Sequence, residues 1–283
     1  MNRTKRRAVQ VIFALGLNSY IVGFMEGKIY QGRVKNLCVP GLNCTSCPGA
    51  WGTCPVSMLQ AGIAGMLSLP AALLALGFIL AIGLSLGRFV CGWFCPFGLL
   101  QELIYGLPVN KPGWVKHKNF QYLKYIILIV FVGLLPALSI WGPSSMAFCR
   151  YVCPVEVLEA SLPLTLARPA LMSMVGLGLV LKAVFLLSML ILASFVLKPF
   201  CRFICPLGAI YGVFNPVSLY RLQLDENKCS GCGSCQVRCP MNIAVYQEPN
   251  HPECIRCNEC MPCPAEALEI KRFFKPVANA KNR

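Results

Sequence analysis

Four long apolar stretches constrain the fold of this chain more than any other feature. They cover residues 8–25 and, approximately, residues 59–86, 122–141 and 171–197. Each is long enough for a helix to cross a hydrocarbon layer roughly 30 Å thick, where a helix satisfies its own backbone hydrogen bonds. The chain is 56% hydrophobic and only 13% charged, which excludes an ordinary soluble globular protein. We therefore expect a mainly α-helical protein whose residues 1–220 form a four-helix transmembrane domain.

Lysine and arginine are unevenly distributed between the two ends of these predicted spans. The N-terminus, the loop after the second span and the tail from Lys198 hold four, five and eleven of them, whereas the other two loops hold three and two. By the positive-inside rule, both termini face the cytoplasm across the inner membrane of a prokaryote. This topology accounts for the net charge of +15, so we expect no nucleic-acid partner.

Lys182 lies inside the fourth apolar stretch. A lysine within a membrane span is a candidate functional residue. The simpler interpretation is that the span starts near Gly178 and that Lys182 extends its amine to the outer interface. We favour the simpler interpretation, because residues 178–197 alone are long enough to cross the membrane.

The C-terminal segment, residues 221–283, contains two runs of four cysteines, each ending in Cys-Pro. Two-residue gaps let successive thiolates of one loop reach different irons of a [4Fe-4S] cluster, and in this bacterial ferredoxin spacing the fourth cysteine ligates the neighbouring cluster. The segment therefore predicts a cytoplasmic, ferredoxin-like α+β domain with two clusters. Structural zinc is the alternative, which two such quartets disfavour. The predicted ligands are Cys229, Cys232, Cys235 and Cys263 for cluster 1, and Cys254, Cys257, Cys260 and Cys239 for cluster 2, with one residue fewer than usual before Cys263.

Two matching Cys-x3-Cys-Pro motifs follow the second and fourth apolar stretches, on the predicted cytoplasmic side. They contain Cys91 and Cys95, and Cys201 and Cys205. This spacing places both sulfurs of a motif on one face of a helix. The two motifs together therefore offer four thiolates to a third [4Fe-4S] cluster at the inner face, and redox-active dithiols are the alternative.

Six further cysteines lie on the predicted outer side. A third Cys-x3-Cys-Pro motif supplies Cys149 and Cys153. With two or more cysteines of the first loop it offers ligands for an outer cluster, whereas an oxidising compartment favours disulfides, for which six cysteines allow 15 pairings. If inner and outer clusters both exist, a core roughly 30 Å thick requires an intermediate carrier or a partner subunit between them. The first-loop cysteines are Cys38, Cys44, Cys47 and Cys54.

These motifs in combination resemble the NapH family of membrane ferredoxin-type proteins, within a wider group that includes NosR and CcoG. The resemblance extends from about residue 60 to residue 270 and applies to the two cytoplasmic Cys-x3-Cys-Pro motifs and the eight C-terminal cysteines. It implies a quinol dehydrogenase component that works with other subunits of a membrane redox complex. The six outer cysteines are not expected in NapH, which suggests a related but distinct branch.

We therefore expect a membrane-bound iron–sulfur protein that passes electrons between the quinone pool and redox partners. A soluble ferredoxin or flavodoxin is a further partner for the basic cytoplasmic surface. One alternative function is electron delivery to a metalloenzyme during its assembly, as in CcoG and NosR, which would not sustain quinol turnover. The other is a thiol redox sensor, in which the Cys-x3-Cys pairs would hold no iron.

No residue in the sequence is diagnostic of a quinone site. Aromatic residues after the second apolar stretch could line an apolar cleft, although an interfacial aromatic belt explains them better. The only two histidines lie outside the apolar stretches, so no bis-histidine haem is expected. The aromatic residues are Trp93, Phe94, Phe97, Tyr105 and Trp114, the nearby candidates to accept a quinol proton are His117, Glu102, Lys116 and Lys118, and the second histidine is His251.

Overall fold

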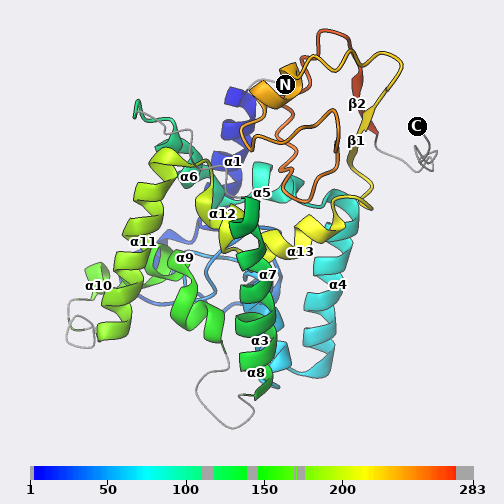
Figure 1. Ribbon diagram of the computed structural model, residues 1–283. Helices are drawn as coiled ribbons and strands as arrows, with labels where there is room; N and C mark the ends of the chain where they lie inside the picture. Colours follow the sequence, from blue (N-terminus) through cyan, green and yellow to red (C-terminus); the bar gives the residue numbers. More distant parts are fainter. Residues whose placement is uncertain (1–2, 110–117, 139–145, 169, 171–175, 272–283) are drawn as a thin grey trace.

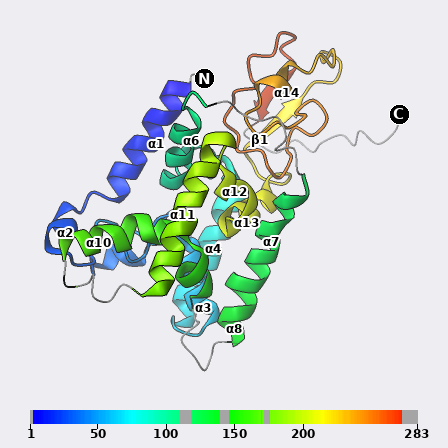
Figure 2. The same ribbon diagram turned by 60° about the vertical axis from the view of Figure 1, so that its left-hand side comes forward.

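The computed structural model describes residues 3–109, 118–138, 146–168, 170 and 176–271. In these residues, three helical segments are long and apolar enough to cross a membrane. They rise side by side toward the C-terminal segment, as Figures 1 and 2 show. The three are α4 (Leu69–Leu86), the segment Phe120–Leu138 and α11 (Leu177–Phe195), of which the second comprises α7 (Leu123–Ile127), a π-helical stretch (Leu128–Leu134) and α8 (Leu135–Leu138).

Most side chains of these three segments face outward. At most 17% of the residues in each segment are buried, and Leu73, Leu181 and Leu187 are 57%, 60% and 58% exposed. Water would penalise an apolar surface of this extent, whereas lipid would not. The three segments therefore indicate a membrane protein.

Residues 8–25, expected as a first span, do not form one continuous helix. Helix α1 (Arg3–Leu17) ends before a short break, and α2 (Ile21–Glu26) follows it. At the break, the backbone N–H of Tyr20 donates to the carbonyl of Gly49 in the first loop, at 3.1 Å. This contact replaces a hydrogen bond that would continue the helix. The predicted count of four transmembrane helices is therefore not confirmed.

Short helices connect the three long segments. Four of them begin with a proline directly after a cysteine, because proline lacks the N–H that the first helical turn leaves unused. Figure 1 shows one group beside the C-terminal segment and α3 nearer the opposite end. The first group is α5 (Phe89–Trp93), α6 (Pro96–Tyr105), α12 (Pro199–Phe203) and α13 (Pro206–Phe214). The remaining helical elements are α3 (Pro55–Ile63), α9 (Pro154–Glu156), α10 (Leu162–Ala167), the π-helical turns Phe148–Val152 and Val157–Ser161, and the 3-10 turns Arg33–Asn36 and Lys118–Tyr122.

The C-terminal segment consists mostly of loops held by one small sheet. Strands β1 (Arg221–Leu224) and β2 (Leu268–Lys271) pair in antiparallel fashion, with Leu222 opposite Ile270. Helix α14 (Ser234–Arg238) and all eight C-terminal cysteines lie between the strands in sequence. Pairing of the strands therefore closes the loops that carry the cysteines, and the mixture of helix and strand agrees with the predicted α+β class.

Candidate functional site

The C-terminal loops bring the eight cysteines together in two sets of four. Each set lines its own small cavity, and the sets are the two quartets that the spacing predicts. The shorter gap before Cys263 does not remove that residue from its set. Cys229, Cys232, Cys235 and Cys263 line one cavity, and Cys239, Cys254, Cys257 and Cys260 line the other.

The donor geometry of these sets suits a group larger than one ion. Thiolates that hold a [4Fe-4S] cubane bind different irons, so they surround a volume instead of a point. Left-handed backbone at Arg256 (φ 50°) and Asn258 (φ 61°) turns the second loop around its cavity.

The Cys-x3-Cys-Pro motifs after α4 and α11 meet in the structure. Cys91, Cys95, Cys201 and Cys205, here called the proximal set, are each at most 5% exposed. Burial raises the pKa of the Cys95 and Cys205 thiols, and the neighbouring thiols of the set raise it further. Without metal these thiols therefore keep their protons, and a metal centre would have to displace them.

The second cysteine of each of these motifs is the N-cap residue of a helix. Cys95 is the N-cap of α6 and its sulfur accepts a hydrogen bond from Gly98 N at 3.4 Å. Cys205 caps α13 in the same way, with Gly208 N at 3.4 Å. N–H groups and the dipole at a helix N-terminus favour a thiolate over a thiol. The Cys-Pro-x-Gly sequence therefore prepares each second cysteine to be a metal ligand.

Basic side chains tie the two motifs to each other. Arg88, before the first motif, donates through Nη2 to the carbonyl of Cys201 at 2.9 Å. Lys198, before the second motif, donates through Nζ to the carbonyl of Cys91 at 3.1 Å. Each cation thus crosses to the first cysteine of the opposite motif. The exchange holds the four thiols of the proximal set together.

Gln101 is a site residue that sequence reasoning missed. It is fully buried on α6; its Nε2 donates to the sulfur of Cys201 at 3.4 Å, and its Oε1 accepts from the backbone N–H of Phe200 at 3.1 Å. The available signal was a glutamine in a helix of apolar side chains, six residues after Cys95. A buried amide of this kind is retained only when its groups are hydrogen-bonded.

The loop that carries Cys254 and Cys257 packs directly on the proximal set. Arg88 Nη1 donates to Pro252 O at 2.9 Å and pairs with Glu253 at 2.7 Å. A Cβ at Gly92 would lie 2.4 Å from the carbonyl oxygen of Ile255, so only glycine permits this approach. Arg88 therefore contacts both the proximal set and the loop before Cys254.

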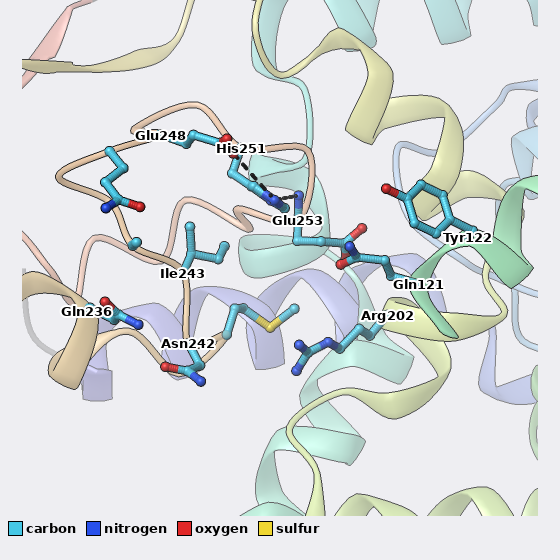
Figure 3. Close-up of a pocket in the computed structure, with 12 residues that line it drawn as sticks. Gln121, Tyr122, Arg202, Gln236, Asn242, Ile243, Glu248, His251 and Glu253 are labelled. Carbon is cyan, nitrogen blue, oxygen red and sulfur yellow. Dashed lines mark hydrogen bonds and ion pairs between the residues drawn. The ribbon is translucent and has the colours of Figure 1, made fainter. Parts of the chain in front are cut away.

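A polar cleft of about 550 Å³ lies beside this junction. Figure 3 shows Gln121, Tyr122 and Arg202 on one side of it, facing Asn242, His251 and other residues of the C-terminal loops. His251 Nδ1 accepts a hydrogen bond from Glu253 N at 3.0 Å. The lining is too polar for the apolar quinone cleft that the sequence analysis considered.

Four of the six remaining cysteines also converge. A cavity of about 180 Å³ is lined by Cys44, Cys54, Cys149 and Cys153, here called the distal set. Cys47 lies apart, with its sulfur 3.5 Å from Asn18 Oδ1. All eighteen cysteines lie in the described residues and are free.

The distal and proximal sets are close neighbours, which corrects the expected separation of roughly 30 Å. The first loop runs inward, and the backbone N–H of Leu42 donates to the thiol of Cys95. Cys44, two residues later, lines the distal cavity. Two residues span at most roughly 7 Å, so the two sets lie much closer together than roughly 30 Å.

Comparison with known proteins assigns the chain to a family. A family model described as a 4Fe-4S binding domain matches residues 68–114, 124–158 and 177–221, and each match contains one Cys-x3-Cys-Pro motif. A second model, also described as a 4Fe-4S binding domain, matches residues 222–244. No solved structure matches the chain.

Three relatives illustrate the similarity. The uncharacterized protein MJ0750 of Methanocaldococcus jannaschii is 35% identical over 70% of this chain and 77% of that protein. The ferredoxin-type protein NapH of Haemophilus influenzae is 27% identical over 71% of this chain and 68% of NapH. The regulatory protein NosR of Stutzerimonas stutzeri is 30% identical over 60% of this chain and 22% of NosR. The chain belongs to the NapH/NosR-like polyferredoxin superfamily. It is a ferredoxin-type iron–sulfur electron-transfer protein, as the sequence analysis predicted.

Of the aromatic residues considered for a quinone cleft, Trp93 and Phe97 are packed in the core of this polyferredoxin, whereas Phe94 and Tyr105 are half-buried. Trp93 is 5% exposed and donates through Nε1 to Arg256 O at 3.1 Å. Phe97 is 1% exposed and packs edge-on against Phe200. The buried carboxylate of Glu102 pairs with Arg6 at 2.5 Å. The other candidates Trp114, Lys116 and His117 lie outside the described residues, and Lys118 begins a 3-10 turn.

The amine of Lys182 does not extend to the outer interface, contrary to the interpretation that we favoured. Its Nζ pairs with Glu156 and donates to the carbonyl of Cys149 at 3.3 Å. The amine is therefore directed to the distal set instead of the outer interface. A cation and a carboxylate that meet beside an apolar helix neutralise each other, which lowers the cost of burying both.

Proposed function

We propose that this polyferredoxin conducts single electrons along a row of sites formed by the two C-terminal quartets and the proximal set. Contacts of Arg88 carry the proposal, because its guanidinium donates both to Cys201 O and to Pro252 O, each at 2.9 Å. Pro252 lies two residues before Cys254 of cluster 2. One side chain thus joins the ferredoxin-like segment to the metal ligands beside the membrane helices.

Bound [4Fe-4S] clusters would supply one-electron oxidation and reduction at these sites. The chain's own groups determine where they sit and in what surroundings. The N–H groups of Gly98, Gly208 and Gln101 point at cysteine sulfurs of the proximal set. Hydrogen bonds to sulfur and burial are the principal means by which a protein sets the potential of such a centre.

Burial also limits water at the proximal set. Phe97 and Phe200 are at most 1% exposed, and their rings pack at right angles with centroids 5.2 Å apart. Apolar rings beside the thiolates keep the local dielectric low. A metal centre there would therefore exchange electrons without exposure to solvent, which suits a relay more than a thiol sensor.

The membrane orientation and partners belong to the same proposal. Both termini and the C-terminal segment would face the cytoplasm, in agreement with the distribution of Lys and Arg. A quinone would be the partner within the membrane, supported by the three apolar helical segments and the resemblance to NapH. Other subunits of a redox complex, or a soluble ferredoxin or flavodoxin, would be the partners at the cytoplasmic face.

Counting iron tests this proposal. Full-length protein should be purified without oxygen in mild detergent, and iron and acid-labile sulfide measured per chain. The variant Cys91→Ser/Cys201→Ser removes one thiolate from each proximal motif and should lose about four irons, because each cubane holds four. EPR signals of reduced clusters 1 and 2 should remain. Iron content equal to that of wild type would overturn the proposal.

Electron transfer is tested on the same preparations. Dithionite-reduced protein in lipid vesicles should be reoxidised by a short-chain quinone, as followed by the iron–sulfur absorbance. The proximal variant should be reoxidised more slowly than wild type. Cys47→Ser is the matched control, because Cys47 is buried but belongs to none of the three sets, and it should behave as wild type does.

A further inference from the structure

The distal set repeats the construction of the proximal set. Cys54 precedes Pro55 at the start of α3, and Cys153 precedes Pro154 at the start of α9. Neither sulfur accepts a cap hydrogen bond, in contrast to the sulfurs of Cys95 and Cys205.

Gln60 matches Gln101 atom by atom. It lies six residues after Cys54, as Gln101 does after Cys95, and both are fully buried. Gln60 Nε2 donates to the sulfur of Cys149 at 3.4 Å, and its Oε1 accepts from Phe148 N at 2.9 Å. In the proximal set, the Nε2 of Gln101 donates to Cys201, the first cysteine of the facing motif, and its Oε1 accepts from Phe200, the residue before that cysteine. Cys149 and Phe148 hold the same two places relative to Gln60.

The cations also correspond. Lys182 donates to the carbonyl of Cys149, as Lys198 does to Cys91 and Arg88 to Cys201. Each of the three Cys-x3-Cys-Pro motifs therefore has a basic side chain on the carbonyl of its first cysteine. This recurrence makes a chance gathering of thiols a poor explanation of the distal cavity.

One position departs from the repeat and is compensated. Four residues before Cys54, where the proximal set has Cys91 before Cys95, the chain has Ala50. Cys44 takes that place, because it lines the cavity with the other three thiols. Its backbone N–H donates to Glu159 Oε2 at 2.7 Å, and Glu159 lies six residues after Cys153. The first loop is thus anchored so that a fourth thiol reaches the set.

We propose that Cys44, Cys54, Cys149 and Cys153 hold a further [4Fe-4S] cluster, with Gln60 and Lys182 as positioning residues. Four thiols, a cavity of about 180 Å³ and an N–H donor on the Cys149 sulfur fit the donor chemistry of such a cluster. The inference rests on the proposed function and extends its row of sites from three to four. Cys38 and Cys47 do not line this cavity.

Tyr211 lies between the two sets and joins them. It is fully buried on α13, and its hydroxyl donates to Pro40 O in the first loop at 3.2 Å. Its ring is within electrostatic range of thiols from both sets, including Cys91 and Cys54. The distal site is therefore a direct extension of the proximal one, directed away from the C-terminal segment.

Metal content tests the distal site. In full-length protein purified without oxygen, Cys149→Ser/Cys153→Ser should contain about four irons and four sulfides fewer than wild type. The control Cys38→Ser/Cys47→Ser should contain as much iron as wild type. Equal iron in the distal variant and wild type, or an equal loss in the control, would overturn the proposal. Alkylation and mass spectrometry that found a disulfide within the distal set would also overturn it.

A second variant tests the distal site without changing any cysteine, so that the test does not depend on the folding of the cysteine variant. Gln60→Leu removes the hydrogen bond to Cys149 sulfur and should shift the midpoint potential of one EPR signal, with iron content unchanged. Gln101→Leu should shift a different signal. If both variants shift the same signal, or Gln60→Leu shifts none, the distal cluster is refuted. Failure here is separate from failure of the proposed function, which is decided by the iron content of Cys91→Ser/Cys201→Ser.

Discussion

Gly92 permits a close approach between α5 and the C-terminal segment, so Gly92→Ala is a direct test of their junction. The added methyl carbon would lie 2.4 Å from Ile255 O, whereas ordinary contact begins near 3.4 Å. The neighbour is a backbone carbonyl, which cannot rotate away as a flexible side chain can. The loop before Cys257 must therefore shift by about 1 Å.

The cost follows from two terms. Forcing an extra methyl group into a packed interior costs roughly 1–3 kcal/mol. A shift of about 1 Å would also break the hydrogen bond from Trp93 Nε1 to Arg256 O, now 3.1 Å long, which contributes roughly 0.5–1.5 kcal/mol. We expect the variant to lose roughly 2–4 kcal/mol of the free energy that holds the C-terminal segment in place.

Thermal unfolding and limited proteolysis in detergent measure this loss. Gly92→Ala should unfold at a lower temperature and be cleaved faster near residues 216–220, with its iron content unchanged because no ligand is altered. Gly77→Ala is the matched control, since no heavy atom lies within 4 Å of its new methyl group, and it should equal or slightly exceed wild type in stability. If the two variants behave alike, the described contact between Gly92 and Ile255 does not exist.

The remaining predictions concern charges, a hydrogen bond and iron. Glu253→Gln leaves Arg88 and Lys124 buried without their shared carboxylate and should cost roughly 3–5 kcal/mol in unfolding free energy, whereas the exposed Glu226→Gln should change it by less than about 0.5 kcal/mol. Gln101→Leu leaves a buried N–H unpaired and should cost roughly 1–3 kcal/mol, seen as a lower melting temperature than wild type. Removing iron with ferricyanide and a chelator should expose the C-terminal segment to protease, because its fold depends on the metal; a protease pattern equal to that of the loaded protein would contradict this.

Features that depend on neighbouring residues could be predicted from the sequence. The two-residue gaps between cysteines determine which thiols of one loop can reach one cluster, and both predicted quartets line common cavities. The length and apolarity of α4 and α11 can be read directly from the residues that form them. Membership of the polyferredoxin superfamily, predicted from the motifs, is confirmed by the comparisons.

The first predicted span shows where local reasoning ended. Residues 8–25 are apolar enough for a membrane helix, but Tyr20 bonds to Gly49 in a loop almost thirty residues later. No local pattern encodes such a partner. Lys182 is a similar case, because hydropathy indicates a side chain that reaches for water, whereas Glu156 and Cys149 O lie within its reach.

The sequence by itself indicated the grouping of the C-terminal cysteines and the three apolar helical segments, because spacing and hydrophobicity act over a few residues. Tertiary structure alone decided which four of six scattered cysteines share the distal cavity. It also decided that Gln60 and Gln101 each donate a hydrogen bond to a cysteine sulfur of the facing motif. The fold likewise brings Leu42, two residues before Cys44, against the Cys95 thiol. Those outcomes depend on contacts between segments far apart in the chain, whose energies only the folded arrangement brings together.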